Sequence, residues 1–132
     1  MKITIVVDAN PIISALIGGV SREVLFDERF NFITTETVIN EVKKYIPLIA
    51  EKSNRSENYI RFTLSLLPIK AIPKDFYKES IKKAKPLIEE RDKKDVEILA
   101  LTLAAGVPLW SQDKDFENID EIVLLKTKDI LV

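Results

Sequence analysis

The feature that most constrains this fold is a helical segment that is apolar on nearly every side. Residues Val96–Ala105 contain only Glu97 and Thr102 as polar members, so we expect other elements to cover this helix around most of its circumference. Gly106 suits a left-handed helix C-cap, and Pro108 cannot continue the helix. The chain must therefore build layers that enclose this segment.

A short apolar strand follows the helix, and acids flank the whole stretch from Arg91 to Phe116. Val107–Trp110 is apolar and ends in a polar turn, as is typical of a buried parallel strand. The acids at the two ends of the stretch are Asp92, Asp95, Asp113 and Asp115. Acids beside buried elements are unfavourable unless they lie near solvent, are paired or bind a cation.

The composition excludes several kinds of chemistry. The 132 residues contain no cysteine and no histidine, which excludes disulfides, thiolate catalysis, imidazole ligands and the commonest general base. Catalysis must then use carboxylates, hydroxyls, amines or a bound metal. A formal net charge of −1 excludes a passive polycation that wraps nucleic acid.

Length and hydropathy predict one soluble domain over residues 1–132. No apolar run approaches the ~18 residues that a membrane span needs. The apolar run after Lys2 is too short for a signal peptide. We therefore expect a cytoplasmic protein with no membrane partner.

Short apolar strands alternate with helical segments along the chain. The expected strands are Ile3–Val7, Asn31–Thr34, Pro68–Ile72, Val107–Trp110 and Glu121–Leu125. Three helices are expected to begin at caps, which are Asn10, Ser21 and Thr35, and the third breaks near Pro47. Further helices are expected at Ser53–Leu67 and Pro73–Ala84, with one more turn at Pro86–Glu90. The chain is expected to end in a short tail at Lys128–Val132. This alternation predicts an α/β fold, a three-layer α/β/α arrangement with a central, mostly parallel sheet.

Several acids are expected to converge at one edge of that sheet. Sites in open parallel sheets form outside the carboxyl ends of the strands. Asp8 follows the first strand, and Asp113 and Asp115 follow the fourth. The helix antiparallel to the strands returns Asp95 to the same edge, and Glu41 lies on or beside the apolar stripe of the helix after the second strand.

Each residue also has an interpretation that needs no ligand. Asp8, Asn10 and Asp92 could be helix caps, and Asp113 and Asp115 could be turn residues. Asp95 could be a first-turn acid that the helix dipole favours by about 0.3–1 kcal/mol. A long Glu41 side chain could reach solvent. The shared sheet edge favours a joint role for these acids over the separate ones.

Convergent acids need a positive charge. Two carboxylates ~4 Å apart repel by about 4 kcal/mol at an effective dielectric constant of ~20, and no basic residue is evidently fixed in their midst. We therefore expect a divalent cation. All-oxygen ligands suit Mg²⁺ or Mn²⁺ rather than zinc or copper, and such a site is typical of nuclease or phosphatase chemistry.

Taken together, these motifs resemble the PIN-domain ribonuclease family over essentially the whole chain. The residues that carry the resemblance are Asp8-Ala9-Asn10 after the first strand, VINEV with Glu41, DVEILALTL with Asp95, and SQDKDF at Ser111–Phe116. The resemblance implies a Mg²⁺- or Mn²⁺-dependent endoribonuclease. It implies metal ligands at Asp8, Glu41, Asp95 and Asp113, and supporting polar residues at Asn10, Ser14, Ser111 and Asp115.

The resemblance also implies partners. Many members are toxins of toxin–antitoxin pairs, usually homodimers restrained by a small antitoxin protein, and others process RNA. Lysines flank the acids in sequence and could hold RNA phosphates: Lys43, Lys44, Lys93, Lys94 and Lys114. Their alternative is a solvated surface.

Other functions fit less well, with one exception. A haloacid-dehalogenase-like phosphatase needs an Asp where Asn10 stands, and a response-regulator receiver needs an acid after the third strand, where Pro73 stands. The serious alternative is a PIN-like fold that binds RNA or protein without catalysis.

Overall fold

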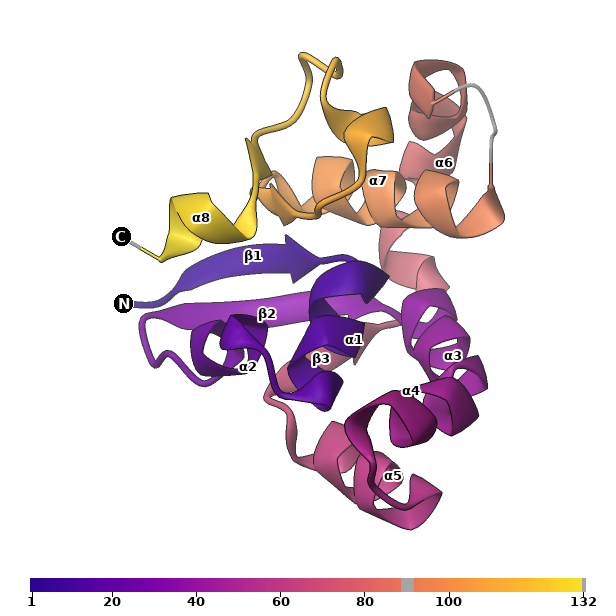
Figure 1. Ribbon diagram of the computed structural model, residues 1–132. Coiled ribbons are helices and arrows are strands. Elements are labelled where there is room, and N and C mark those ends of the chain that lie inside the picture. Colours follow the sequence, from indigo (N-terminus) through magenta and orange to yellow (C-terminus); the bar gives the residue numbers. More distant parts are fainter. Residues whose placement is uncertain (89–91, 132) are drawn as a thin grey trace.

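The computed structural model describes residues 1–88 and 92–131 (Figure 1). The strands are β1 (Ile3–Val7), β2 (Phe30–Thr35), β3 (Ile69–Ile72), β4 (Leu109–Trp110) and β5 (Leu124–Leu125). The helices are α1 (Ala9–Ile17), α2 (Val20–Leu25), α3 (Glu36–Lys44), α4 (Ile46–Ser53), α5 (Glu57–Leu66), α6 (Lys74–Ile88), α7 (Lys93–Ala105), the short 3-10 helix η1 (Lys114–Phe116) and α8 (Thr127–Ile130). Within the described ranges, no helix has the length and hydropathy to cross a membrane.

All strands of the described sheet are parallel, in the spatial order β3-β2-β1-β4-β5. The sheet predicted from the sequence is therefore confirmed. From β1 the chain adds β2 and β3 on one side, and it then crosses back to add β4 and β5 on the other. The strand order thus reverses between β1 and β4, and open α/β sheets place their sites beyond the carboxyl ends of the strands at this point.

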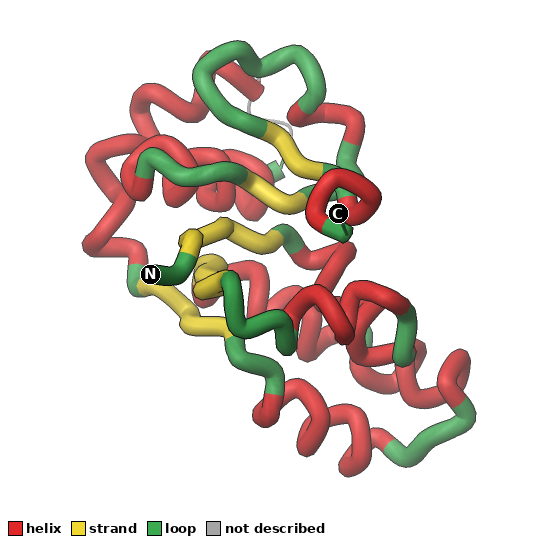
Figure 2. The backbone as a smooth tube through the Cα atoms, turned by 90° about the vertical axis from the view of Figure 1, so that its left-hand side faces the viewer, coloured by secondary structure: helices red, strands yellow, loops and turns green. Residues whose placement is uncertain are grey.

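Helices cover both faces of the sheet, and Figure 2 shows them on the two sides of the strands. Right-handed crossovers put α1–α5, which connect β1, β2 and β3, on one face. The same rule puts α6 and α7, which lead from β3 to β4, on the other face. Accordingly α1 packs against α2, α3, α4 and α5, whereas α7 packs against α6, β1 and β2 and also contacts α3. The predicted three-layer α/β/α architecture is confirmed.

Helix α7 is enclosed as its apolar sequence predicts. Every residue from Val96 to Thr102 is buried, including Glu97. The Thr102 hydroxyl donates to the carbonyl of Ile98 at 2.8 Å, so it is satisfied within the helix. Gly106 has φ = 65° and its N–H donates to the Thr102 carbonyl, which confirms the left-handed C-cap.

The first two helices begin earlier than predicted. Asp8, not Asn10, is the N-cap of α1, and its Oδ1 accepts the backbone N–H of Ala9 at 2.8 Å. Gly19 precedes α2, and Ser21 is buried inside that helix instead of capping it. In both cases the residue with extended backbone, the geometry of an N-cap, comes directly before the helix.

Between α3 and β3 the chain forms two helices, α4 and α5. The sequence predicted a break near Pro47 and a single helix over Ser53–Leu67. Pro47 lies in the first turn of α4, where its missing N–H breaks no helical hydrogen bond. Asn54, with a left-handed φ of 56°, ends α4. Ser56 then caps α5 by accepting the backbone N–H of Tyr59 at 3.0 Å. The predicted helix Ser53–Leu67 is therefore shorter at its start.

Two further segments differ from the prediction at their ends. Helix α6 continues through Pro86 beyond its expected end. The expected strand Glu121–Leu125 is reduced to β5, and residues 128–130 of the expected tail belong to α8. Residues 89–91 lie outside the described residues. They include the end of the predicted turn Pro86–Glu90 and the first residue of the stretch from Arg91 to Phe116.

Candidate metal centre

A buried serine joins the carboxylate of Asp8 to the backbone of Asp113 where the strand order reverses. Asp8 follows β1 and is 4% exposed, and Ser111 follows β4 and is fully buried. The Ser111 hydroxyl donates to Oδ2 of Asp8 at 2.7 Å. The same hydroxyl oxygen accepts the backbone N–H of Asp113 at 3.0 Å, and Asp113 Oδ1 accepts that of Asp115 at 2.9 Å. These bonds fix the loop after β4 relative to Asp8.

Helix α7 brings another acid to this loop. Asp92 caps the helix by accepting the backbone N–H of Lys94 at 3.0 Å, so Asp95 lies in the first turn. Carboxylate oxygens of Asp95, Asp113 and Asp115 lie within 4.8 Å of one another. Asp95 is buried, Asp113 is half-buried and Asp115 is exposed, so the group opens to solvent on one side. Asp92 is the N-cap of α7, which confirms the interpretation of this residue as a helix cap.

The surroundings disfavour the ionised form of two of these acids. Burial, opposed by the ammonium of Lys94 and reinforced by Asp8 and Asp113, raises the pKa of Asp95 to about 6. Burial also raises the pKa of Asp8, although the hydrogen bond from Ser111 lowers it. Both carboxylates would gain from a further positive charge at this edge of the sheet.

A lysine lies among the acids, which corrects the expectation that no basic residue stands in their midst. Nζ of Lys94 is 3.7 Å from Oδ1 of Asp95 and 3.7 Å from Oδ2 of Asp92. Burial lowers the pKa of Lys94, but Asp95, Asp92, Asp8 and Glu41 together raise it above its ordinary value. The signal in the sequence is the position of Lys94 directly before Asp95 in the first helical turn.

Glu41 lies at the margin of the acidic group. Helix α3 carries it next to the buried Val42, with its side chain 26% exposed. Its Oε2 is 3.8 Å from Nζ of Lys44, and its charge acts on Lys94. Among the described residues, the carboxylates grouped within 4.8 Å include neither Glu41 nor Asp8. The role of Glu41 as a ligand, direct or through water, stays a prediction.

The supporting residues implied by the resemblance take different positions. Ser111 joins Asp8 to the loop after β4, as described above. Asn10 is exposed in the first turn of α1, two residues after Asp8. The Ser14 hydroxyl lies beside Gly19, which follows the C-terminus of α1. The structure thus holds Ser111 against the acids and directs Ser14 toward the other end of its helix.

The candidate RNA-binding lysines divide into two sets. Lys44 and Lys94 lie within 4 Å of acids at this edge, and Lys114 is exposed in η1 directly after Asp113. Lys43 lines a groove of about 610 Å³ between α3, α5 and β3. Lys93 lines a cavity of about 360 Å³ between α6 and α7.

Two residues outside the predicted set fix the elements that carry the acids. Oε1 of Glu97 accepts the hydroxyls of Tyr77 at 2.7 Å and Thr37 at 3.1 Å, which joins α7 to α6 and α3. Oε1 of Gln112 accepts the backbone N–H of Thr127 at 2.9 Å, which joins the loop after β4 to α8. The sequence marks Glu97 as a polar residue in an apolar helix. It gives no signal for Gln112, because the helix that it contacts was expected to be a tail.

The donor set fits a hard divalent cation. Its ligand atoms are carboxylate oxygens, which Mg²⁺ and Mn²⁺ prefer. Asp8 and Asp95 are buried with raised pKa values, and a bound cation favours their ionised form. The exposed side at Asp115 leaves an approach for water and substrate. Asp95, Asp113 and Asp115, whose carboxylate oxygens are grouped, with Asp8 and Glu41 beside them, are therefore the candidate metal centre.

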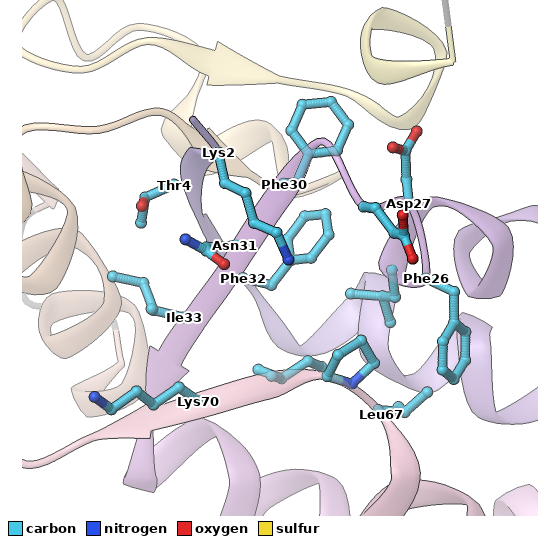
Figure 3. A pocket seen from close by; sticks show the side chains of 14 residues that line it. Lys2, Thr4, Phe26, Asp27, Phe30, Asn31, Phe32, Ile33, Leu67 and Lys70 are labelled. Carbon is cyan, nitrogen blue, oxygen red and sulfur yellow. The ribbon is translucent and has the colours of Figure 1, made fainter.

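A larger hollow lies at the opposite end of the strands. This cavity has a volume of about 840 Å³. Figure 3 shows residues that line it, among them Lys2, Phe30 and Phe32. Its lining comes from the amino ends of β1, β2 and β3 and from the end of α2. The carboxylate group described above is not part of it, so size alone does not identify the reactive site.

Comparisons with known proteins agree with this architecture. The family model described as PIN domain matches residues 6–123. No curated protein matches the sequence. Among solved structures, the chain is similar to a chain in the crystal structure of VapBC2 from Rickettsia felis, which is bound to a DNA fragment from the VapBC2 promoter. That match has a TM-score of 0.68 and 11% sequence identity, and it covers 94% of this chain and 98% of that chain. At this identity the likeness concerns the fold.

Proposed function

The chain belongs to the PIN-domain family, and on this premise we propose that it is a Mg²⁺- or Mn²⁺-dependent endoribonuclease that hydrolyses phosphodiester bonds. The observation that supports the proposal is the carboxylate group where the strand order reverses. Asp8 and Asp95 are buried there with raised pKa values. An acid placed so at a solvent-accessible edge is more typical of a functional site than of a structural one.

In the proposed mechanism, Asp8, Asp95 and Asp113 would hold the metal, and Glu41 and Asp115 would complete its surroundings directly or through water. When bound, the divalent ion supplies a nucleophilic water and stabilises negative charge on the phosphoryl group. The chain orients the ligands in advance. The Ser111 hydroxyl donates to Oδ2 of Asp8 at 2.7 Å, and the first turn of α7 places Asp95 beside the loop after β4.

The RNA backbone would approach from the exposed side of the acids. Lys44, Lys94 and Lys114 lie around this opening and can contact phosphates, which positions the strand without reading its sequence. Lys43 and Lys93 line separate hollows, so they serve flanking nucleotides in this proposal, farther from the bond that is cut.

The proposal includes a biological role as the toxin of a toxin–antitoxin pair. The resemblance in sequence motifs supports it, and so does the shared fold with VapBC2, which was crystallised on promoter DNA. The corresponding partners are a small antitoxin protein and a second copy of this chain in a homodimer. A cytoplasmic location belongs to the same proposal. The observation that tests the role is a small reading frame beside this gene that encodes a DNA-binding segment, and its absence would favour housekeeping RNA processing.

The enzymatic proposal is tested by replacing Asp8 with Asn. Asn keeps an oxygen that can cap α1, so Asp8→Asn should fold like the wild-type protein. We expect it to lower Mn²⁺-dependent cleavage of a structured RNA panel by about 10³-fold. The matched control is Glu28→Gln, which removes an exposed carboxylate at the amino end of the sheet and should cleave normally. A wild-type protein that cuts no RNA with metal present would favour the non-catalytic binding module.

A further inference from the structure

One lysine is built into the acidic group that the proposed function assigns to a metal. Lys94 has a side chain only 28% exposed, and its Nζ is 3.7 Å from Oδ1 of the buried Asp95. The same Nζ is 3.7 Å from Oδ2 of Asp92. The charges of Asp8 and Glu41, which come from β1 and α3, act on it as well. The ammonium therefore faces acids from three elements.

This position makes the ammonium and a divalent ion competitors. A carboxylate oxygen bound to Mg²⁺ lies ~2.1 Å from the ion. An ammonium 3.7 Å from Oδ1 of Asp95 would then stand within about 6 Å of the ion, a distance at which their like charges repel appreciably. Without a divalent ion, the same ammonium is the positive charge closest to Asp95 among the described ion pairs. The ammonium therefore pairs with the Asp95 carboxylate when no divalent ion is bound, and the divalent ion would bind the same carboxylate when it is present.

We propose that Lys94 is the built-in counterion of the acidic group, stabilising its carboxylates when no divalent ion is bound and competing with that ion for Asp95. The inference rests on the proposed function only in taking the acids as a metal site. It makes Lys94 a positioning residue that sets how tightly the metal is held. It also explains why Asp95 can stay buried before a metal arrives.

The inference predicts effects of opposite sign on two properties. Removing the ammonium leaves the carboxylates to repel one another, so the metal-free protein becomes less stable. Removing it also removes the competitor, so the divalent ion binds more tightly. A lysine with a merely structural role would lower stability without raising metal affinity. The signature of a counterion is therefore the pair of opposite shifts.

The experiment uses the full chain and Mn²⁺ alone, with no RNA. Isothermal titration should show Lys94→Met binding Mn²⁺ about tenfold more tightly than the wild-type protein, because a nearby positive charge is gone. In EDTA the melting temperature of Lys94→Met should fall by roughly 2–5 °C. Lys94→Arg keeps the charge and should keep Mn²⁺ affinity within about twofold.

The matched control is Lys93→Met, which makes the same change one residue away. The Lys93 side chain lines the cavity between α6 and α7, away from the grouped carboxylates, so its Mn²⁺ affinity should stay close to that of the wild-type protein. Equal affinities in Lys94→Met and the wild-type protein would overturn the inference while leaving the proposed function standing. Equal gains in both Met variants would overturn it too. Failure of every variant to bind Mn²⁺ would overturn the metal site itself.

Discussion

Helix α7 carries two buried acids two residues apart, and they lie in opposite kinds of surroundings. Asp95 is 5% exposed and Glu97 is 2% exposed. Glu97 lies between three helices and accepts the Tyr77 and Thr37 hydroxyls through Oε1. Its Oε2 is buried without a hydrogen-bond partner among the described residues. No hydrogen bond from another described residue reaches the Asp95 carboxylate, whose neighbours are other acids and the Lys94 ammonium.

The difference shows that burial by itself does not mark a functional acid. A buried carboxylate that accepts hydrogen bonds from neutral donors on several packed elements contributes to packing and specificity. A buried carboxylate that is crowded by other carboxylates is unstable until a cation arrives. We therefore assign Glu97 to the structural scaffold and Asp95 to the candidate metal centre.

The largest effect is expected on RNA cleavage. Asp95→Asn should lower kcat/KM for metal-dependent cleavage by about 10³-fold or more, because it removes a charged ligand. Glu97→Gln keeps a carbonyl oxygen for the two hydroxyls and should stay within about tenfold of the wild-type value. Steady-state kinetics on one cleavable RNA make the comparison. Similar losses in both variants would break the contrast.

The next effect is on stability without metal. Glu97→Ala removes the acceptor of the Tyr77 and Thr37 hydroxyls and leaves a cavity, so it should lower the free energy of unfolding by about 3 kcal/mol. Glu97→Gln is the control and should lose about 1 kcal/mol or less. Urea unfolding in EDTA measures both. A Glu97→Ala protein as stable as Glu97→Gln would remove Glu97 from the scaffold.

A third effect concerns metal binding. Mn²⁺ at about 100 times its Kd stabilises a folded protein by ~2.7 kcal/mol, which should raise the melting temperature by roughly 10 °C. We expect this rise in the wild-type protein and in Glu97→Gln, and little or none in Asp95→Asn. Thermal denaturation with and without Mn²⁺ gives the answer. Equal rises in all three proteins would place the metal elsewhere.

The smallest effect is a dependence of stability on pH. Burial raises the pKa of Asp95 from 3.8 to about 6, so the unfolded chain loses this proton first as the pH rises. The stabilising contribution of the protonated Asp95 is full below about pH 4 and is lost as the pH rises through about 6. The wild-type protein in EDTA should lose about 1–3 kcal/mol relative to Asp95→Asn over this window. A difference that stays constant with pH would contradict the shifted pKa.

Much of the fold follows from local sequence signals. The β-branched run of β1 and the short apolar strands separated by helices predict a parallel sheet, and Gly106 ends α7 as expected. The signals fail where one residue type serves two structures. Pro47 suits both a break and the first turn of a new helix, and packing decided for the helix. Asn10 is a good cap, yet Asp8 caps α1.

The candidate site could be predicted in outline but not in detail. Strand order sends Asp8 and Asp113 to one edge, because parallel strands share a carboxyl end. The direction of a long side chain depends on its packed neighbours, which the sequence does not reveal. Packing therefore leaves Glu41 at the margin of the grouped carboxylates and brings the Lys94 ammonium close to Asp95. Only tertiary packing separates Asp95 from Glu97.

The central claim is that the acids at the reversal of strand order form a metal-dependent nuclease centre. The most direct test is to incubate the wild-type protein with one labelled RNA in EDTA and in Mn²⁺, and to identify the new ends. Attack by water leaves no 2′,3′-cyclic phosphate, whereas metal-free cleavage through the ribose 2′-hydroxyl does. With a metal-dependent nuclease centre, we expect cuts that appear only with Mn²⁺, carry no cyclic phosphate and vanish in Asp95→Asn. Cleavage in EDTA, cyclic phosphate ends, or undiminished cutting by Asp95→Asn would contradict it.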